Sequence, residues 1–526
     1  MANKDSGLLE ACISNETKKL FEKISCEHPL DNDVLQALSK LYTAIKDADE
    51  YAIFRHQAET DTLWRLLLEK AIKCLRYYDE REPFGDNAGK KPQVYGLDEL
   101  FAYYKNYKEF EQMLYGSSQY YRDHVVHVLR TWLSGIRCLV RDNGRYLECI
   151  SIRDKKDVNL DPVEKVSIWT IIALTHDLGY PLEQAKEIIE KTQAMVGTFV
   201  ANPDISMDLS FHGVQNYMND FIIRLMSSKM VDASIKDTEG KIIEEKYVAR
   251  LQPKYYFKFL KSLEKTRHGV ISTLIIYKLL TYFLESDYNL NEDYYFTFDD
   301  RRQFYIRREI LRAIASHTCT DVYHLYMGSF AFLLIIADDM QEWGRKYISE
   351  LYVPATIKHS RNDIFLTVSS NTVEQSHQCR LSESVTVEKN DGWKAVVALL
   401  NRLREQALVY VTIFRDGQDT SKRDFLFIRE FSVNYDTDES IIFNMTLKIS
   451  NRDASEFTGN ITYSPDGTKN KDFGRDFIKE LKNRTGADIS WRVFDASGNE
   501  IPKPTAASAG TWQNGTISIK LTTQYE

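Results

Sequence analysis

The 526-residue chain contains few of the residues that interrupt or crosslink a fold. It has 23 glycines, 11 prolines and 7 cysteines, and 43% of its residues are hydrophobic. This composition excludes a disordered or low-complexity chain and indicates well-packed cores. The odd number of cysteines, with no Cys-x-x-Cys pair, argues against a disulfide framework and indicates scattered reduced thiols.

Long apolar runs and an excess of positive charge are also missing. The longest apolar run, "FAFLLIIA" at 330–337, is far shorter than the ~20 residues that span a bilayer. The first residues contain no apolar stretch typical of a signal peptide. The net charge of −8 argues against a general nucleic-acid-binding surface, although a local basic pocket for a small anion is compatible with it. We therefore expect a cytoplasmic protein with no membrane partner.

Helical periodicity extends from the beginning of the chain to about residue 350. Apolar residues recur at spacings of three and four in "NDVLQALSKLYTAIKDADEYAIF" and "DTLWRLLLEKAIKCLRYYDE", each entered by an Asp or Asn that can act as a cap. The loop-like stretch "REPFGDNAGKKPQVYG" separates these two segments from further long helical patterns. We predict an N-terminal helical segment over 1–90 and a helical core over 91–351. The charged run 236–246 is expected to be a solvated loop or hairpin.

The pattern changes after about residue 352. Short β-branched or aromatic runs such as "DIFLTVSS", "ALVYVTIFRDG" and "FLFIREFSVNYD" are separated by turn residues, and two helical patterns, "GWKAVVALLNRLREQA" and "KDFGRDFIKELKNR", interrupt them. These features predict an α+β domain over 352–526. The predicted fold class is therefore multidomain, mainly α, with a C-terminal α+β domain. This domain has no obvious catalytic set, so we expect an accessory role, either in regulation, where a regulatory nucleotide could bind, or in oligomerisation.

Histidines and aspartates of the central block stand near the beginnings and ends of its helical patterns. Taken singly, each has a structural explanation as a core residue or a polar helix end. Imidazole nitrogen and carboxylate oxygen are also ligands for Mn, Fe, Ni, Zn or Mg, which bind phosphate oxygens and lower the pKa of a bound water. In chain order these residues are His124, His127, His176, Asp177, His268, His317 and Asp338.

The order His, His-Asp, His, His, Asp in a helical block resembles the HD superfamily of metal-dependent phosphohydrolases. "ALTHDLGYP" is similar to the family's apolar-x-His-Asp-x-Gly segment, and "IIADDMQEW" is similar to its final apolar-Ala-Asp segment. The resemblance covers about residues 110–350, roughly half of the chain. It implies an HD-type helical bundle that hydrolyses a phosphoester or phosphoanhydride bond of a nucleotide with a metal-activated hydroxide.

The resemblance also implies roles for individual residues. His268 and His317 would either bind a second ion or act as catalytic groups that protonate a leaving oxygen, and Asp177 would take part in catalysis. The choice between His124 and His127 as ligand stays open, although "HVLRTWLSG" favours His127 as ligand and His124 as a catalytic neighbour that touches substrate. Asp338 is preferred over Asp339 because it directly follows the apolar run. The core ligands of one or two divalent ions (Mn, Fe, Mg, Ni or Zn) would be His127, His176, Asp177 and Asp338.

Cationic and aromatic residues close to these segments are candidate substrate contacts. Arginine neutralises phosphate and pairs with it bidentately, and a tyrosine could stack or hydrogen-bond near the metals. Each arginine is equally well explained as a surface or interhelical ion pair. The candidates are Arg122, Tyr180, Arg267 and Arg345.

The motifs leave the subfamily open. "HDLGYP" contains the letters of the HD-GYP subfamily, but the chain has no adjacent histidines, and the His-Pro-Pro continuation typical of deoxynucleoside triphosphate hydrolases is missing. A deoxynucleoside triphosphate is the first expected substrate. A cyclic or oligomeric nucleotide is the alternative, which the additional histidines favour because they suit two ions. A catalytically inactive HD-like module that senses a nucleotide is the rival from another class. We expect a homo-oligomer.

Overall fold

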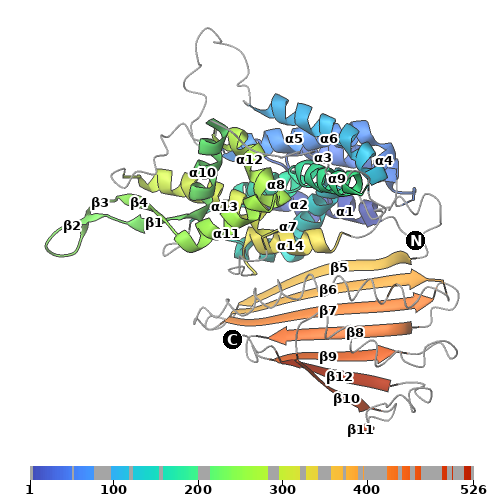
Figure 1. Cartoon of the computed structure of the whole chain (residues 1–526). Helices are drawn as coiled ribbons and strands as arrows, with labels where there is room; N and C mark the ends of the chain where they lie inside the picture. The colour runs from blue at the N-terminus through green and yellow to red at the C-terminus, as the bar shows by residue number, and fades with distance from the viewer. Residues whose placement is uncertain are drawn as a thin grey trace. The chain divides into compact units, whose positions relative to one another are not determined.

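In the computed structural model the chain folds into two compact units (Figure 1). The first consists of residues 1–322, 328–338 and 345–349, and the second of residues 323–327, 339–344 and 350–526. The structure describes residues 4–49, 52–75, 96–117, 123–152, 158–198, 214–281, 295–319, 327–341, 357–370, 375–388, 395, 423–435, 441–450, 456–463, 488–494, 500–501 and 515–522.

The first unit is mainly helical, which confirms the prediction made from the periodicity of the first 350 residues. Segment 1–90 and the helices of the predicted core belong to the same unit. Its helices are α1 (Lys4–Ile13), α2 (Asn15–Phe21), α3 (Asn32–Ile45), α4 (Ala52–Arg55), α5 (Gln57–Leu75), α6 (Leu97–Ser117), α7 (His127–Cys149), α8 (Pro162–Thr175), α9 (Tyr180–Gly197), α10 (Val214–Ser227), α11 (Pro253–Glu264), α12 (His268–Thr281), α13 (Phe298–Ser316) and α14 (Phe330–Asp339).

Helix α8 forms the centre of this unit. A capping box begins the helix: the Asp161 N–H donates to Glu164 Oε2 at 2.8 Å, and Pro162 occupies the first turn. The helix is apolar on nearly every face, and its residues from Val166 to Thr175 are all buried. A helix of this kind belongs in the interior, and α8 accordingly packs against α5, α7 and α13.

The contact between α7 and α8 depends on a glycine. A Cβ atom at Gly135 would lie 2.1 Å from the Trp169 ring, so only glycine leaves space for this indole. Two indole hydrogen bonds join the helices: Trp169 Nε1 donates to Trp132 O at 3.1 Å, and Trp132 Nε1 donates to Thr170 Oγ1 at 2.9 Å. The close approach brings the beginning of α7 near the end of α8.

The N-terminal helices are bonded to the central ones. Arg130 of α7 donates to both carboxylate oxygens of Asp5 in α1, from Nε at 3.0 Å and from Nη2 at 2.8 Å, and both side chains are fully buried. Trp64 of α5 donates through Nε1 to the Leu174 carbonyl at 3.1 Å. The N-terminal segment thus supports the helices that carry the histidines.

A long hairpin follows α10. Strand β1 (Ser228–Asp232) pairs with β4 (Tyr247–Leu251), and β2 (Ile235–Lys236) pairs with β3 (Ile242–Glu244), all antiparallel. The charged run 236–246 forms the end of this hairpin, in agreement with the expected loop or hairpin.

The second unit contains an eight-stranded sheet, so the predicted change to β-structure after residue 352 is confirmed. Its order is β11-β10-β12-β9-β8-β7-β6-β5, with neighbours antiparallel except for the parallel pair β6–β7. The helix predicted over 392–407 is described only at Ala395, which is helical and buried. The helix predicted over 471–484 and the strand predicted over 407–417 lie outside the described residues. The strands are β5 (Ile357–Ser370), β6 (Gln375–Val387), β7 (Arg423–Tyr435), β8 (Ile441–Ser450), β9 (Glu456–Tyr463), β10 (Asp488–Phe494), β11 (Glu500–Ile501) and β12 (Gly515–Thr522).

Among the helices that the structure describes, none is both long enough and apolar enough to cross a membrane.

The Asp5–Arg130 pair is expected to be essential for the stability of the first unit. Asp5→Ala leaves the Arg130 guanidinium buried without this carboxylate and should destabilise the unit by about 3–5 kcal/mol. The measurement is the unfolding midpoint followed by circular dichroism. Glu10→Ala, an exposed position of the same helix, is the control and should leave the midpoint unchanged. Equal midpoints for both variants would contradict the assigned role.

Candidate metal centre

Four imidazole rings and two carboxylates meet inside the first unit. Each stands at or near a helix terminus: His127 and His268 are the first residues of α7 and α12, His176 and His317 directly follow α8 and α13, and Asp338 is in the last turn of α14. Because these helix ends converge, residues up to 211 positions apart in sequence come into contact.

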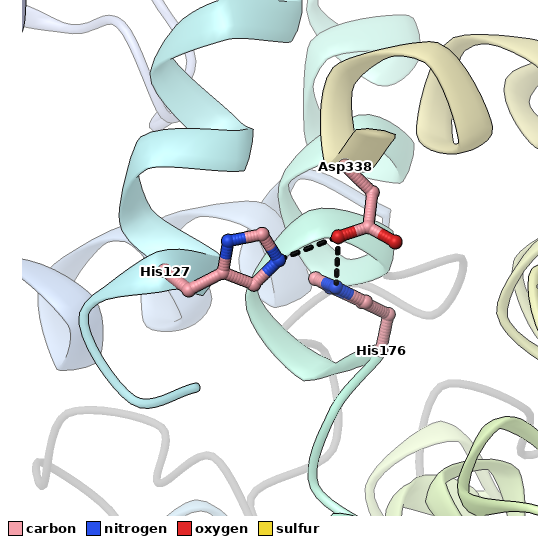
Figure 2. A group of neighbouring side chains, drawn as sticks. All are labelled: His127, His176 and Asp338. Atoms are coloured by element: carbon pink, nitrogen blue, oxygen red, sulfur yellow. Dashed lines mark hydrogen bonds and ion pairs between the residues drawn. The ribbon is translucent and has the colours of Figure 1, made fainter. Parts of the chain in front are cut away.

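The first cluster is formed by His127, His176 and Asp338 (Figure 2). Asp338 Oδ1 lies 2.5 Å from His127 Nε2 and 3.7 Å from His176 Nε2. One ligand atom from each residue lies within 4.8 Å of the other two. Two nitrogens and one oxygen at this spacing could hold one divalent ion.

The second cluster consists of His176, Asp177 and His317, and His268 lies beside it. Asp177 Oδ1 lies 3.6 Å from His176 Nε2, 3.5 Å from His317 Nε2 and 3.4 Å from His268 Nε2. The Nε2 atoms of His268 and His317 are 3.1 Å apart. His176 belongs to both clusters, so two ions bound there would be neighbours.

The other ring nitrogens of three histidines point away from Asp177 and Asp338. Nδ1 of His176 lies 2.9 Å from the Ala173 carbonyl, Nδ1 of His317 contacts the Ile314 carbonyl, and Nδ1 of His268 lies 2.5 Å from Glu183 Oε2. A carbonyl only accepts hydrogen bonds, so Nδ1 of His176 and of His317 must carry a proton. A neutral ring then has its lone pair on Nε2, which is the arrangement of a metal-binding histidine.

Burial makes this arrangement costly without a cation. His127, His176 and Asp177 are 1%, 0% and 4% exposed, and the buried Nε2 atom of His176 has no hydrogen-bond partner among the described residues. Asp177 Oδ1 and Asp338 Oδ1, at 3.6 Å and 3.7 Å, lie beyond hydrogen-bond distance of this atom, so a bound ion would supply the close partner that it lacks. The donor set, which has no thiolate, therefore fits a divalent ion of the Mn, Fe, Mg, Ni or Zn type.

The charges within the clusters determine the protonation of both carboxylates. Burial by itself would raise the pKa of Asp177, but His176 and the other nearby imidazoles outweigh burial and hold it well below its usual range. His127 and His176 likewise keep the pKa of Asp338 low against the effect of burial. Burial also lowers the pKa of His176, but Asp177 and Asp338 together raise it to about 9. Both carboxylates are therefore ionised and favour positive charge between the rings.

The turn that carries His176 and Asp177 is held by side chains from other helices. Ser272 Oγ of α12 donates to the His176 carbonyl at 2.6 Å and accepts from the Gly179 N–H at 2.8 Å. Tyr103 of α6 donates to the Leu178 carbonyl at 2.6 Å. A Cβ atom at Gly179 would lie 2.4 Å from the His268 carbonyl, so glycine is required for α12 to approach this turn.

A second glycine brings α12 and α13 together. A Cβ atom at Gly269 would lie 2.5 Å from Thr318 Oγ1, 2.8 Å from the Ile314 carbonyl and 3.0 Å from Cε1 of the His317 ring. The close contact between His268 and His317 therefore depends on the missing side chain at this position.

The remaining sequence candidates lie beside the clusters or outside the described residues. His124 stacks on Tyr180, with ring centroids 3.7 Å apart and planes at 18°, and Tyr180 meets His268 edge-on at 5.3 Å. His124 belongs to neither metal cluster found among the described residues. Arg267 lies next to His268, half-exposed, and donates to Glu183 at 3.2 Å. Arg122 and Arg345 fall outside the described residues.

Sequence reasoning did not identify Glu183 or Ser272. Glu183 stands in the first turn of α9, six residues after Asp177, and burial that would raise its pKa is outweighed by His268 and Arg267, which lower it. The one signal available in the sequence was its position in the helix that follows the His-Asp pair. Ser272 gives no such signal, because its contacts span 93 and 96 residues.

Comparison of the chain with protein-family models, curated proteins and solved structures gives no match. Its function therefore has to be inferred from the donor set and its geometry, together with the motif resemblance.

Gly269→Ala should weaken binding at the second cluster selectively. The added methyl group forces α12 and α13 apart, so His268 and His317 separate while His127 and Asp338 keep their places. Calorimetric titration with Mn²⁺ should show two ions per wild-type chain and one per variant. Gly7→Ala is the control, since open space surrounds that position of α1. A variant that binds two ions as tightly as the wild type would contradict this account.

Proposed function

We propose that this chain is a metal-dependent phosphohydrolase that cleaves a phosphoester or phosphoanhydride bond of a nucleotide. The observation that carries the proposal is the convergence of four imidazole Nε2 atoms on the carboxylates of Asp177 and Asp338. The HD-type assignment of the helical unit is part of this proposal and is supported by the chain order of these residues.

The donors would divide between two ions. His127, His176 and Asp338 would hold one, and Asp177, His317 and His268 would hold the other, with His176 between them. Divalent ions in such a site neutralise phosphate oxygens and lower the pKa of a water molecule.

Two of the proposed ligands are partly exposed, which the access of a substrate would require. The side chains of Asp338 and His268 are 28% and 18% exposed, whereas that of His176 is 0% exposed. The stacked rings of His124 and Tyr180 lie beside His268 and outside both clusters. In this proposal His124 would contact the scissile phosphate, and Tyr180 would contact the substrate beside it; their position next to His268 supports these roles.

The nucleotide assignment depends on the resemblance to the HD superfamily, with a deoxynucleoside triphosphate as the first expectation. The second cluster favours the alternative, a cyclic or oligomeric nucleotide, because two neighbouring ions can stabilise both the attacking and the leaving oxygen of a phosphodiester. An inactive nucleotide-sensing module is the weaker candidate, since every donor of both clusters is in place. The cytoplasmic location, the homo-oligomer and the regulatory role of residues 352–526 remain predictions.

Replacing either carboxylate with its amide should remove activity. Asp177→Asn and Asp338→Asn each lose an anionic ligand, and turnover should fall at least about a thousandfold because a catalytic ion supplies several kcal/mol. Metal content by mass spectrometry should fall in parallel, with helicity unchanged. The control is Asp339→Asn, which replaces the neighbouring aspartate and should keep both metal and turnover. Full activity of Asp177→Asn would refute the proposal.

A nucleotide panel with products resolved by mass should identify the bond cleaved. Incubation with Mn²⁺ is expected to give a deoxynucleoside and triphosphate, loss of single phosphates, or opening of a cyclic phosphate, and each result identifies one substrate class. Chelation should stop the reaction and added Mn²⁺ should restore it. Tight binding of a nucleotide with no hydrolysis, in protein shown to hold metal, would instead favour the sensing module.

A further inference from the structure

Glu183 makes three contacts at the beginning of α12. Its Oε2 lies 2.5 Å from His268 Nδ1 and accepts from the His268 backbone N–H at 2.7 Å. Its Oε1 accepts from Arg267 Nη1 at 3.2 Å. One carboxylate thus binds both the ring and the backbone of the same histidine.

We propose that Glu183 is a positioning residue that orients the His268 imidazole and thereby completes the second ion position. This inference depends on the proposed function, because it concerns the ligands of the second ion. Glu183 itself lies behind the ring and is not one of the ligands.

The geometry leaves His268 one useful orientation. An ionised carboxylate only accepts hydrogen bonds, so Nδ1 of His268 carries the proton that it shares with Glu183. Nε2 then faces Asp177 Oδ1 at 3.4 Å and His317 Nε2 at 3.1 Å, where it could bind an ion together with them. A ring turned by 180° would lose the Glu183 contact, so Glu183 selects the orientation that binds metal.

His268 cannot use the support that His176 and His317 have. His176 and His317 directly follow helices, and each contacts a carbonyl of its own last turn through Nδ1. His268 is the first residue of its helix, where the free backbone groups are N–H donors and no carbonyl of a preceding turn is available. A carboxylate from α9 supplies the acceptor instead, and it also satisfies the His268 N–H.

A role limited to surface ion pairing does not account for these contacts. Arg267 is half-exposed, and an exposed ion pair contributes little to stability. Glu187, one turn further along α9, shows the surface case: it pairs with Lys191 at 2.6 Å, and both side chains are at least half-exposed. The Glu183 side chain, by contrast, is 20% exposed and contacts His268, which lies beside the second cluster.

The test measures Mn²⁺ binding to the full chain with two methods. Calorimetry gives the affinity for each ion, and electron paramagnetic resonance detects a coupled pair of ions. Glu183→Ala should bind the first ion as the wild type does, bind the second about 10- to 100-fold more weakly, and lose the coupled signal. Glu183→Gln should lose less, since its amide oxygen can still accept from Nδ1. Glu187→Ala is the matched control and should bind both ions normally.

Different results would overturn different parts of the inference. If wild type binds two ions and Glu183→Ala binds both with unchanged affinity, the positioning role is wrong and the proposed function stands. If the wild type binds no ion, the proposed function fails and this inference fails with it. Should Glu183→Ala not fold, Glu183→Gln decides: equal loss of both ions with normal helicity refutes the role, and weakening of the second ion alone supports it.

Discussion

Two ionised carboxylates inside a helical unit are the constraint on which the rest of the structure depends. Asp177 is nearly fully buried, and Asp338 is partly exposed beside it. Negative charge in such surroundings is stable only when cations or strong donors surround it. Four histidine rings supply that environment here, either as imidazolium donors or through the ions that they would hold, and each ring has to be delivered by a different helix.

The helices can bring these rings together because glycine occupies three of the contacts between them. Gly135, Gly179 and Gly269 each occupy a contact where a Cβ atom would lie less than 3.0 Å from a neighbouring helix or turn. They allow α7 to approach α8, and α12 to approach both the His-Asp turn and α13. The same approach positions the histidines at the helix ends, so packing and ligand geometry are set by the same contacts.

Several features of the site follow from local sequence, and others do not. The helical pattern and the glycine and proline that follow it predict that His176 and Asp177 stand at the end of a helix. The chain order of the remaining histidines and Asp338 suggests that they belong together. Neither Glu183 nor Ser272 has a local signal of this strength, because each acts on a residue 85 or more positions away.

The sequence by itself determined the helical character of the first 350 residues, the change to strands after residue 352, and the types of donor available to a cation. Periodicity and composition are local properties, so they can be recognised along the chain. Tertiary structure decided the pairing of His127 with Asp338, the stacking of His124 on Tyr180, and the presence of Glu183 behind His268. Such contacts depend on how helices pack in space, and that packing is governed by the fit of side chains from distant segments.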